Sequence, residues 1–273
     1  MIDNPLELRA ALVAADIDVW VSTPSFAEMC LADRRFNASH LPRLACFLFC
    51  GETLAPSCVR RLQARFPAAR IYNLYGPTEA TVAVTSVLVD EALLNAHATL
   101  PLGTPRPDTR LDIVDGEIVI DGPCVSPGYL HAEELTARVF DGTRYRTGDA
   151  GHYQDGALMF GGRLDFQVKL SGYRIELEDI AHNLETLAAV EKAVVLPIEL
   201  AGRCEALVAF VVVRPGCDVT PASLRAEVAL RVPGYMVPRD IICRTTLPMT
   251  VNGKIDRTRL AAEIVTDRSR PPS

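Results

Sequence analysis

The alternation of short apolar runs with helical patterns over the first 75 residues restricts the fold most strongly. Apolar residues recur at helical spacing after Pro5. A second helix is expected to begin at Thr23 or Ser25, where a hydroxyl can cap the first turn and Pro24 suits it. The alternation continues with strand and helix patterns at residues 19–21, 45–50, 56–66 and 70–74. Strands separated by helices favour parallel pairing, so we predict an α/β layer here.

The pattern changes after Thr81, where residues 81–89 form a β-rich run. Two Asp-Gly pairs follow: residues 115–116 lie between the apolar runs 111–114 and 117–120, and residues 155–156 come after residues 145–153. Asp-Gly permits tight hairpin turns between antiparallel strands. We therefore predict an antiparallel sheet or a β-barrel-like subdomain in this part of the chain.

Helical periodicity returns only at residues 176–189, and it is followed by buried strand patterns and one more helix. This mixture predicts a small α+β domain. The polar stretch at residues 161–165 predicts the boundary, which gives two parts, residues 1–164 and residues 165–273. The tail after Asp267 is expected to be frayed.

Composition limits the class of protein. With 49% hydrophobic and 23% charged residues, the chain has the balance of a soluble globular protein. A net charge of -6 without clustered Lys and Arg argues against a nucleic-acid partner. No apolar run is long enough to cross a bilayer, and the first residues lack the features of a secretion signal, so we expect a cytoplasmic protein. Eight scattered cysteines without a C-x-x-C pair are expected to be mostly core residues, without disulfides.

A glycine–proline turn after the strand at residues 70–74 carries Tyr75, Gly76, Thr78 and Glu79. Such a turn can offer an aromatic face to a base, a hydroxyl to a phosphate and a carboxylate to magnesium. A plain strand-ending turn with a capping threonine is equally compatible with these residues.

Two later stretches carry candidate polar groups. Asp149 is expected at a hairpin, where it could accept hydrogen bonds from ribose hydroxyls or serve only as a turn former. Arg163 can donate a planar fork to ribose or phosphate oxygens, Asp165 stands where a hinge is expected, and Gly172 permits close backbone approach. The alternative for the stretch from Gly161 is a glycine-rich linker into a helix.

Near the end of the chain, an Asn252-Gly253 turn carries Lys254. A lysine held on a tight loop can place a compact positive charge against a carboxylate and an α-phosphate in a transition state. Alone, the same turn is typical of a solvated hairpin.

Together, and in this order, the four segments resemble the later core motifs of the acyl- and aminoacyl-adenylating superfamily. The sequence is most similar to the family of D-alanine–[D-alanyl carrier protein] ligases, along nearly the whole chain. The stretches that carry this likeness are Thr23-Pro24-Ser25-Phe26, Phe49-Cys50-Gly51-Glu52, residues 75–86 and Asp165-Phe166-Gln167.

The resemblance implies a reaction and its partners. The implied cofactors are ATP and Mg²⁺, and the implied substrate is D-alanine. A carboxylate would be activated to an acyl-adenylate, then transferred to the phosphopantetheine thiol of a carrier protein after the small C-terminal domain rotates. In that family the reaction serves D-alanylation of teichoic acid at the cell wall.

The resemblance also implies a role for each residue. Asn73 and Tyr75 would frame the adenine with Gly51 and Glu52 on the same side, Thr78 would meet the α-phosphate, and Glu79 would hold magnesium. Asp149 and Arg163 would bind the ribose, and Lys254 would be the catalytic residue that bridges substrate and phosphate. Asp165 would be the pivot, and Gly172 would line the thiol tunnel. Cys50 would lie against the alanine methyl group and help select the D enantiomer, unless it is only a core cysteine at a strand end. The implied nucleotide-binding residues are therefore Gly51, Glu52, Asn73, Tyr75, Gly76, Thr78, Asp149, Arg163 and Lys254.

One part of the family pattern has no counterpart in this sequence. Family members carry an upstream Ser/Thr/Gly-rich loop around the β- and γ-phosphates, and an upstream aspartate for the alanine amino group. We therefore expect a missing N-terminal half as a partner, and little activity from this chain alone. The alternatives are an amino-acid adenylation domain of peptide-synthetase type, and a non-catalytic module that binds a carrier protein or AMP.

Overall fold

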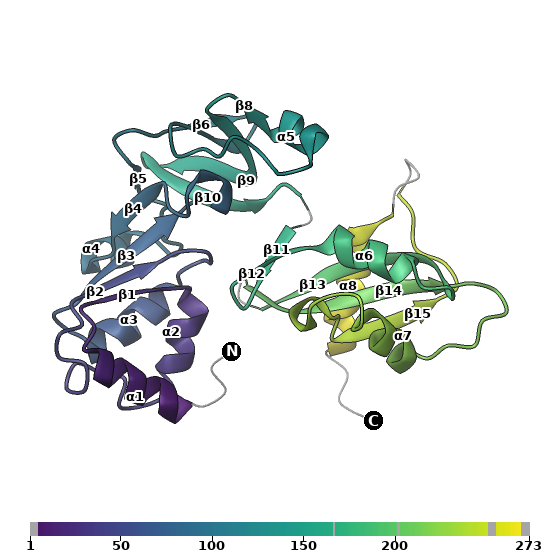
Figure 1. The fold of residues 1–273 in the computed structure, drawn as a ribbon, viewed down its shortest axis with the longest axis horizontal. Helices are drawn as coiled ribbons and strands as arrows, with labels where there is room; N and C mark the ends of the chain where they lie inside the picture. The colour runs from purple at the N-terminus through teal and green to yellow at the C-terminus, as the bar shows by residue number, and fades with distance from the viewer. Residues whose placement is uncertain (1–4, 166, 201–202, 251–254, 269–273) are drawn as a thin grey trace. The chain divides into compact units, whose positions relative to one another are not determined.

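The computed structural model describes residues 5–165, 167–200, 203–250 and 255–268 (Figure 1). The chain divides into two compact units, Met1–Asp165 and Phe166–Ser273. Among the described residues, no helix combines the length and apolar character needed to cross a membrane.

The first sheet of unit 1 has five strands in the order β1-β2-β3-β4-β5. Its strands β1 (Val19–Ser22), β2 (Cys46–Phe49) and β3 (Arg70–Tyr75) are parallel, whereas β4 (Thr85–Leu88) and β5 (Thr104–Pro105) pair antiparallel. The helices α1 (Pro5–Ala15), α2 (Pro24–Cys30) and α3 (Pro56–Arg65) precede β1, β2 and β3 in turn (Figure 1). The predicted α/β layer is therefore confirmed.

An aromatic cluster forms the core of this layer. Phe47 is fully buried and packs edge to face against Phe36 and Phe66, with ring centroids 6.4 and 5.1 Å away. Trp20 stacks on Phe26 of α2 at 5.5 Å. Such pairs add to the free energy gained from apolar burial, so they fix the helices against the sheet. Thr23 precedes α2 as expected, but its hydroxyl makes no cap hydrogen bond.

The prediction of a β-rich run over residues 81–89 is wrong in its first half. A 3₁₀ turn, η1 (Thr78–Ala80), ends in a left-handed residue, and β4 begins only at Thr85. Two short helices, α4 (Glu91–Ala96) and α5 (Glu133–Val139), also lie where no helix is predicted. The Asp90 side chain caps α4 by accepting a 2.8 Å hydrogen bond from the Leu93 N–H.

The second sheet of unit 1 has the order β10-β9-β7-β6, with β8 paired to β9. Its bounds are β6 (Arg110–Val114), β7 (Glu117–Asp121), β8 (Phe140–Asp141), β9 (Arg144–Gln154) and β10 (Ala157–Arg163). Both predicted Asp-Gly hairpins form, with φ of 53° and 82° at Asp115-Gly116 and 52° and 79° at Asp155-Gly156. These angles fit type I′ turns. The described strands form an open antiparallel sheet, not a closed barrel.

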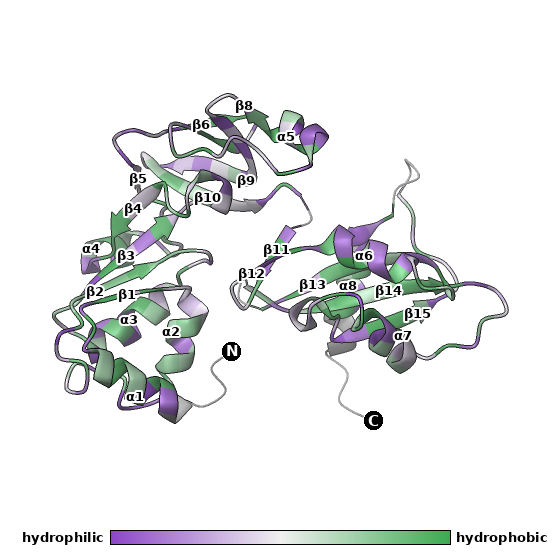
Figure 2. Ribbon diagram, viewed as in Figure 1, coloured by the Kyte–Doolittle hydropathy of each residue, from purple (hydrophilic) through white to green (hydrophobic). Residues whose placement is uncertain are grey.

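Unit 2 contains a third sheet with the order β12-β11-β14-β13, and β15 also pairs with β14. Its strands are β11 (Gln167–Leu170), β12 (Tyr173–Glu176), β13 (Val190–Leu200), β14 (Arg203–Val213) and β15 (Asp240–Arg244). Its helices are α6 (Leu177–Glu185), α7 (Pro221–Val228) and α8 (Arg257–Arg268), with a 3₁₀ turn, η2 (Gly234–Met236). Figure 2 shows β13 and β14 as mainly hydrophobic.

Strand β14 separates two apolar cores. Leu207 and Val211 join one core with Leu184 of α6 and Leu224 of α7, whereas Phe210 joins another core with Leu260 of α8. Successive side chains along a strand point to opposite faces of the sheet, so these two cores cover both faces. The predicted α+β character is confirmed. The tail after residue 268 lies outside the described residues.

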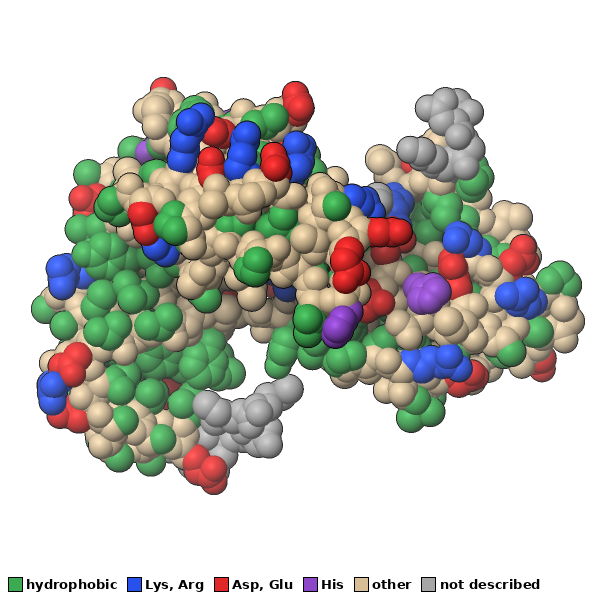
Figure 3. Space-filling view, turned by 45° about the horizontal axis from the view of Figure 1, so that its top comes forward, with side chains coloured by type: hydrophobic (Ala, Val, Ile, Leu, Met, Phe, Trp, Pro, Cys, Tyr) green, Lys and Arg blue, Asp and Glu red, His purple; other side chains and the backbone are tan. Residues whose placement is uncertain are grey.

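The burial of the cysteines differs from the prediction. None of the eight cysteines is in a disulfide, but only Cys30, Cys58 and Cys124 are buried, so the prediction that most are core residues is wrong. Cys217 and Cys243 are exposed. Figure 3 shows acidic and basic side chains interspersed on the visible face of unit 1.

Candidate functional site

Strand β3 brings alternate side chains into unit 1 and ends in the glycine–proline turn. Asn73 and Tyr75 are 6% and 7% exposed. The Asn73 amide donates a 2.9 Å hydrogen bond to the Pro101 carbonyl, and the Tyr75 hydroxyl donates a 2.6 Å bond to Asp149 Oδ2. Burial, and then the Asp149 carboxylate, raise the pKa of Tyr75 well above its ordinary value. Tyr75 is therefore a fixed hydrogen-bond donor to Asp149.

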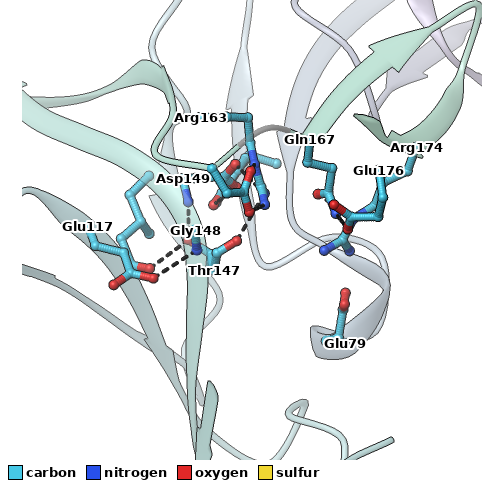
Figure 4. Close-up of polar contacts among 12 residues, drawn as sticks. Glu79, Glu117, Thr147, Gly148, Asp149, Arg163, Gln167, Arg174 and Glu176 are labelled. Atoms are coloured by element: carbon cyan, nitrogen blue, oxygen red, sulfur yellow. Dashed lines mark hydrogen bonds and ion pairs between the residues drawn. The ribbon is translucent and has the colours of Figure 1, made fainter. Parts of the chain in front are cut away.

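Asp149 lies on the β9–β10 hairpin, but in a strand and not in the turn, so it is not a turn former. Asp149 lies within β9 and is 3% exposed, directly across the ladder from Arg163 of β10. Arg163 Nη1 donates a 2.8 Å bond to Asp149 Oδ1 (Figure 4). Each carboxylate oxygen thus accepts one of these bonds, and each has a second lone pair for a further donor.

Arg163 bridges two carboxylates at the end of unit 1. Besides Asp149, it bonds Asp165 through Nε at 2.8 Å and through Nη2, and it donates to the Thr147 carbonyl at 2.9 Å. Burial lowers the pKa of Arg163, but bonds to Asp165 and the charge of Asp149 outweigh that effect and raise it. The guanidinium therefore stays charged, and it joins the predicted ribose contact to the predicted pivot.

Gly148 makes this arrangement possible. Its φ is +70°, and a Cβ there would lie 2.8 Å from Arg163 Nη2 and from Asp165 Oδ2. A side chain would meet both strain and close contact. The glycine beside Asp149 therefore leaves the space that the Arg163–Asp165 pair occupies.

The glycine–proline turn is closely packed and strained. A Cβ on Gly76 would lie 2.8 Å from the Val82 carbonyl oxygen. Thr81 and Val82 have φ of 59° and 69°, a conformation that costs a non-glycine residue about 1–3 kcal/mol. The Thr81 hydroxyl donates a 2.8 Å bond to the Cys124 carbonyl, which helps to hold the strained pair. Thr78, ahead of them, is exposed.

Glu79 is a single, well-oriented carboxylate on this turn. It is 8% exposed, and Oε1 accepts a 2.6 Å bond from the Tyr129 hydroxyl. Burial, followed by that bond, raises the pKa of Tyr129, so the phenol stays a donor. Within the described residues, no group of three or more His, Cys, Asp or Glu could hold a metal. One carboxylate suits Mg²⁺, which is commonly held by one or two carboxylates and by phosphate oxygens of the substrate.

The Cys50-Gly51-Glu52 segment links β2 to its neighbours. The half-buried Cys50 thiol lies 3.3 Å from the Val82 carbonyl oxygen, so it contacts the strained turn. Gly51 has a φ of +94°. The Glu52 carboxylate accepts bonds from the Ser25 N–H at 3.0 Å and the Ser25 hydroxyl at 2.9 Å. Glu52 therefore anchors the first turn of α2 to the loop after β2.

The structure brings some predicted residues into direct contact and leaves others apart. Tyr75, Asp149, Arg163 and Asp165 form one connected network. Gly172 lies in unit 2, in the turn between β11 and β12, with a φ of +85°. The predicted Asn252-Gly253-Lys254 turn lies outside the described residues.

Three polar residues that support the site are not predicted from the sequence: Glu117, Tyr129 and Thr147. Glu117 is the one that a sequence pattern could reveal. It is an acidic residue that follows an Asp-Gly turn and opens an otherwise apolar strand. A charge at such a position needs a partner when it is buried.

Family models match both parts of the chain. Residues 2–130 match the model described as AMP-binding enzyme, and residues 178–254 match the AMP-binding enzyme C-terminal domain. Two curated relatives, from Bacillus cereus and Bacillus mycoides, are both named D-alanine–D-alanyl carrier protein ligase. Each is 48% identical over 97% of this chain and 56% of the relative. The chain thus spans about half the length of these relatives.

The chain is also similar to solved structures of enzymes. An amide bond synthetase from Marinactinospora thermotolerans matches with a TM-score of 0.82 and 25% identity, over 95% of this chain and 55% of that one. An adenylation domain from Vibrio cholerae, in complex with glycyl-adenosine-5′-phosphate, matches with a TM-score of 0.78 and 25% identity, over 96% and 52% of the two chains.

Proposed function

The chain belongs to the AMP-binding enzyme family, and we propose that it is the carboxyl-terminal part of an ATP-dependent D-alanine–carrier protein ligase. The whole ligase would form D-alanyl-AMP and pyrophosphate from D-alanine and ATP. It would then transfer the alanyl group to the phosphopantetheine thiol of a carrier protein, for D-alanylation of teichoic acid. Because ATP is an intracellular substrate, the proposed reaction belongs in the cytoplasm.

The observation that carries the nucleotide assignment is the convergence of Tyr75, Arg163 and Asp149. Two independent donors each hold one oxygen of the Asp149 carboxylate, and its remaining lone pairs match the two hydroxyls of a ribose. Arg163 adds a positive charge within the same network, which suits a nucleoside monophosphate. The identity to relatives named for D-alanine supports the choice of substrate.

The other assignments come from the resemblance to the family, and the positions of Thr78 and Glu79 support two of them. Thr78 is exposed on the turn, so its hydroxyl would donate to the α-phosphate. Glu79, aimed by Tyr129, would hold Mg²⁺, which supplies neutralisation of phosphate charge when bound. Asn73, Gly51 and Glu52 would lie around the base. Lys254 would stabilise charge at the α-phosphate, and Gly172 would lie along the path of the thiol.

Cys50 supports the D-alanine assignment because it is a small side chain beside the strained turn. A thiol is a weak hydrogen-bond donor and behaves as a small hydrophobic group, so the Cys50 thiol beside the Val82 carbonyl can offer an apolar wall to a methyl group. A larger side chain there would press on the Val82 carbonyl. We therefore propose that Cys50 sets the size and handedness of the accepted amino acid.

The decisive experiment is ATP–pyrophosphate exchange. This chain alone should show little exchange with D-alanine, whereas addition of the amino-terminal part of the Bacillus cereus relative should restore a measurable rate. D-alanine should exceed L-alanine, glycine and D-serine. A preference for another amino acid would favour an adenylation domain of peptide-synthetase type. Binding of AMP or carrier protein without exchange, even after complementation, would favour a non-catalytic module.

A further inference from the structure

The carboxylate of Glu117 has no part in the proposed chemistry, yet it is among the most buried charges of unit 1. Glu117 opens β7 and is 7% exposed. Its Oε1 accepts a 2.8 Å bond from the Gly148 N–H, and its Oε2 accepts a 2.5 Å bond from Arg146 Nη2 (Figure 4). A charge is buried in a protein only when partners such as these compensate for its lost hydration. The structure around Glu117 should therefore show why a carboxylate is needed there.

The explanation lies in a bulge of β9. Glu117 pairs with Ala150 and Val119 pairs with Arg146, so residues 147–149 of β9 lie opposite the single residue Ile118. Extra residues interrupt the ladder and leave backbone groups to be satisfied by other partners. The bulge contains Asp149, the residue proposed to bind ribose.

Side chains replace the interrupted ladder. The Thr147 hydroxyl donates to the Ile118 carbonyl at 2.7 Å and accepts from the Asp149 N–H at 3.0 Å. Glu117 takes the Gly148 N–H, and the Gly148 carbonyl accepts a 2.8 Å bond from the Leu164 N–H. These contacts therefore fix the backbone that leads into Asp149, and Glu117 supplies the one from β7 to the central residue of the bulge.

We propose that Glu117 is a positioning residue: by holding the Gly148 N–H, it sets the direction in which Asp149 presents its carboxylate to a ribose diol. This rests on the proposed role of Asp149. We attribute this role to the hydrogen bond with Gly148 and not to the ion pair with Arg146. The Arg146 side chain is half-exposed, so water can solvate its charge when the ion pair is lost.

Two substitutions of Glu117 separate the effect of side-chain length from the effect of charge, and a third tests the ion pair. Glu117→Asp keeps the charge beside Arg146 but withdraws the carboxylate from Gly148 by one methylene. Glu117→Gln loses the charge but keeps an oxygen acceptor at the same length. Arg146→Ala removes the ion pair and leaves the Gly148 contact in place.

The readout is the affinity of this chain for AMP and for 2′,3′-dideoxy-AMP, measured by calorimetry. The wild-type chain should bind AMP about tenfold more tightly, as expected for hydrogen bonds from a diol to a carboxylate. Glu117→Asp should lose most of this ratio while its affinity for the dideoxy analogue stays unchanged. Glu117→Gln and Arg146→Ala should keep the ratio. Hydrogen exchange at the Gly148 amide should accelerate only in Glu117→Asp.

The outcomes are distinguishable. If wild type does not discriminate between the two nucleotides, or Asp149→Asn discriminates as well as wild type, the role of Asp149 fails. If wild type discriminates and Glu117→Asp does too, the positioning role of Glu117 is overturned. Equal loss of both affinities in Glu117→Asp would also overturn it, because that result indicates a general structural role. If Glu117→Asp does not fold, the Glu117→Gln ratio decides, since loss of that ratio contradicts the proposal.

Discussion

The β9 bulge and the glycine–proline turn carry the proposed nucleotide contacts of unit 1, and they hold their backbones by different means. In the β9 bulge, the residue with positive φ is Gly148, and hydrogen bonds with Glu117 of β7 and with Leu164 hold it. In the glycine–proline turn, positive φ falls on Thr81 and Val82, two exposed residues without the conformational freedom of glycine. The difference shows that a left-handed residue inside a sheet can be held by satisfied polar groups, whereas exposed left-handed residues can be held by close packing of the turn around them.

The largest expected effect is that of Gly148→Ala. Both the positive φ and the contact with Arg163 and Asp165 oppose a Cβ, so unfolding free energy should fall by about 3 kcal/mol. Gly116→Ala is the matched control, because Gly116 has a φ of +82° and open space around it. It should cost only about 1 kcal/mol in urea unfolding. Equal losses would show that packing beside Arg163 contributes nothing.

Tyr75→Phe removes one of the two donors to Asp149 from the buried network. Stability should fall by about 1.5 kcal/mol, measured by urea unfolding at neutral pH. Since burial raises the folded pKa of Tyr75, its contribution is fully present below the unfolded value, about 10, and is lost as the pH rises beyond it. The variant should therefore lose less stability than wild type above pH 10. A steeper alkaline loss in the variant would contradict a buried, protonated phenol.

Val82→Gly tests the strained turn and should act in the opposite direction. Val82 is 61% exposed with a φ of 69°, so glycine should raise stability by about 0.5 kcal/mol once its greater unfolded-state entropy is included. Val21→Gly is the comparison, since Val21 is 68% exposed in the extended strand β1 and gains nothing from glycine. Destabilisation by both to the same extent would mean that Val82 is unstrained.

Thr78→Ala should have the smallest effect on folding. Because Thr78 is exposed, its removal should leave the thermal midpoint unchanged while it weakens AMP binding by about fivefold and adenosine binding not at all. Calorimetry with the two ligands gives the comparison. Equal weakening of both would place Thr78 away from the phosphate.

Local chemistry explains which parts of the fold could be predicted. The two Asp-Gly hairpins and the helix that begins at Pro24 are specified by neighbouring residues alone. The bulge at Asp149 is not, because its Gly148 N–H bonds to Glu117, which is far away in sequence and adjacent only once β7 and β9 pair. The same reason hides the donor role of Tyr129 toward Glu79, 50 residues away.

Short elements and thiols show a second limit. Helices α4 and α5 have six and seven residues, too few for a clear helical period. The β-rich composition of residues 81–89 conceals a turn because its strained residues, Thr81 and Val82, are ordinary strand formers. Cysteine is often buried, but that average does not locate any one thiol, as exposed Cys217 and Cys243 show.

The bridge made by Arg163 has a mechanical consequence. One guanidinium grips Asp149 on one side and Asp165, the last residue of unit 1, on the other. A rotation of the backbone at residue 165 that moves the Asp165 side chain would therefore act on the guanidinium that holds the Asp149 carboxylate inside β9. A rotation at Asp165 and the binding of a ligand at Asp149 are therefore linked through the planar guanidinium of Arg163.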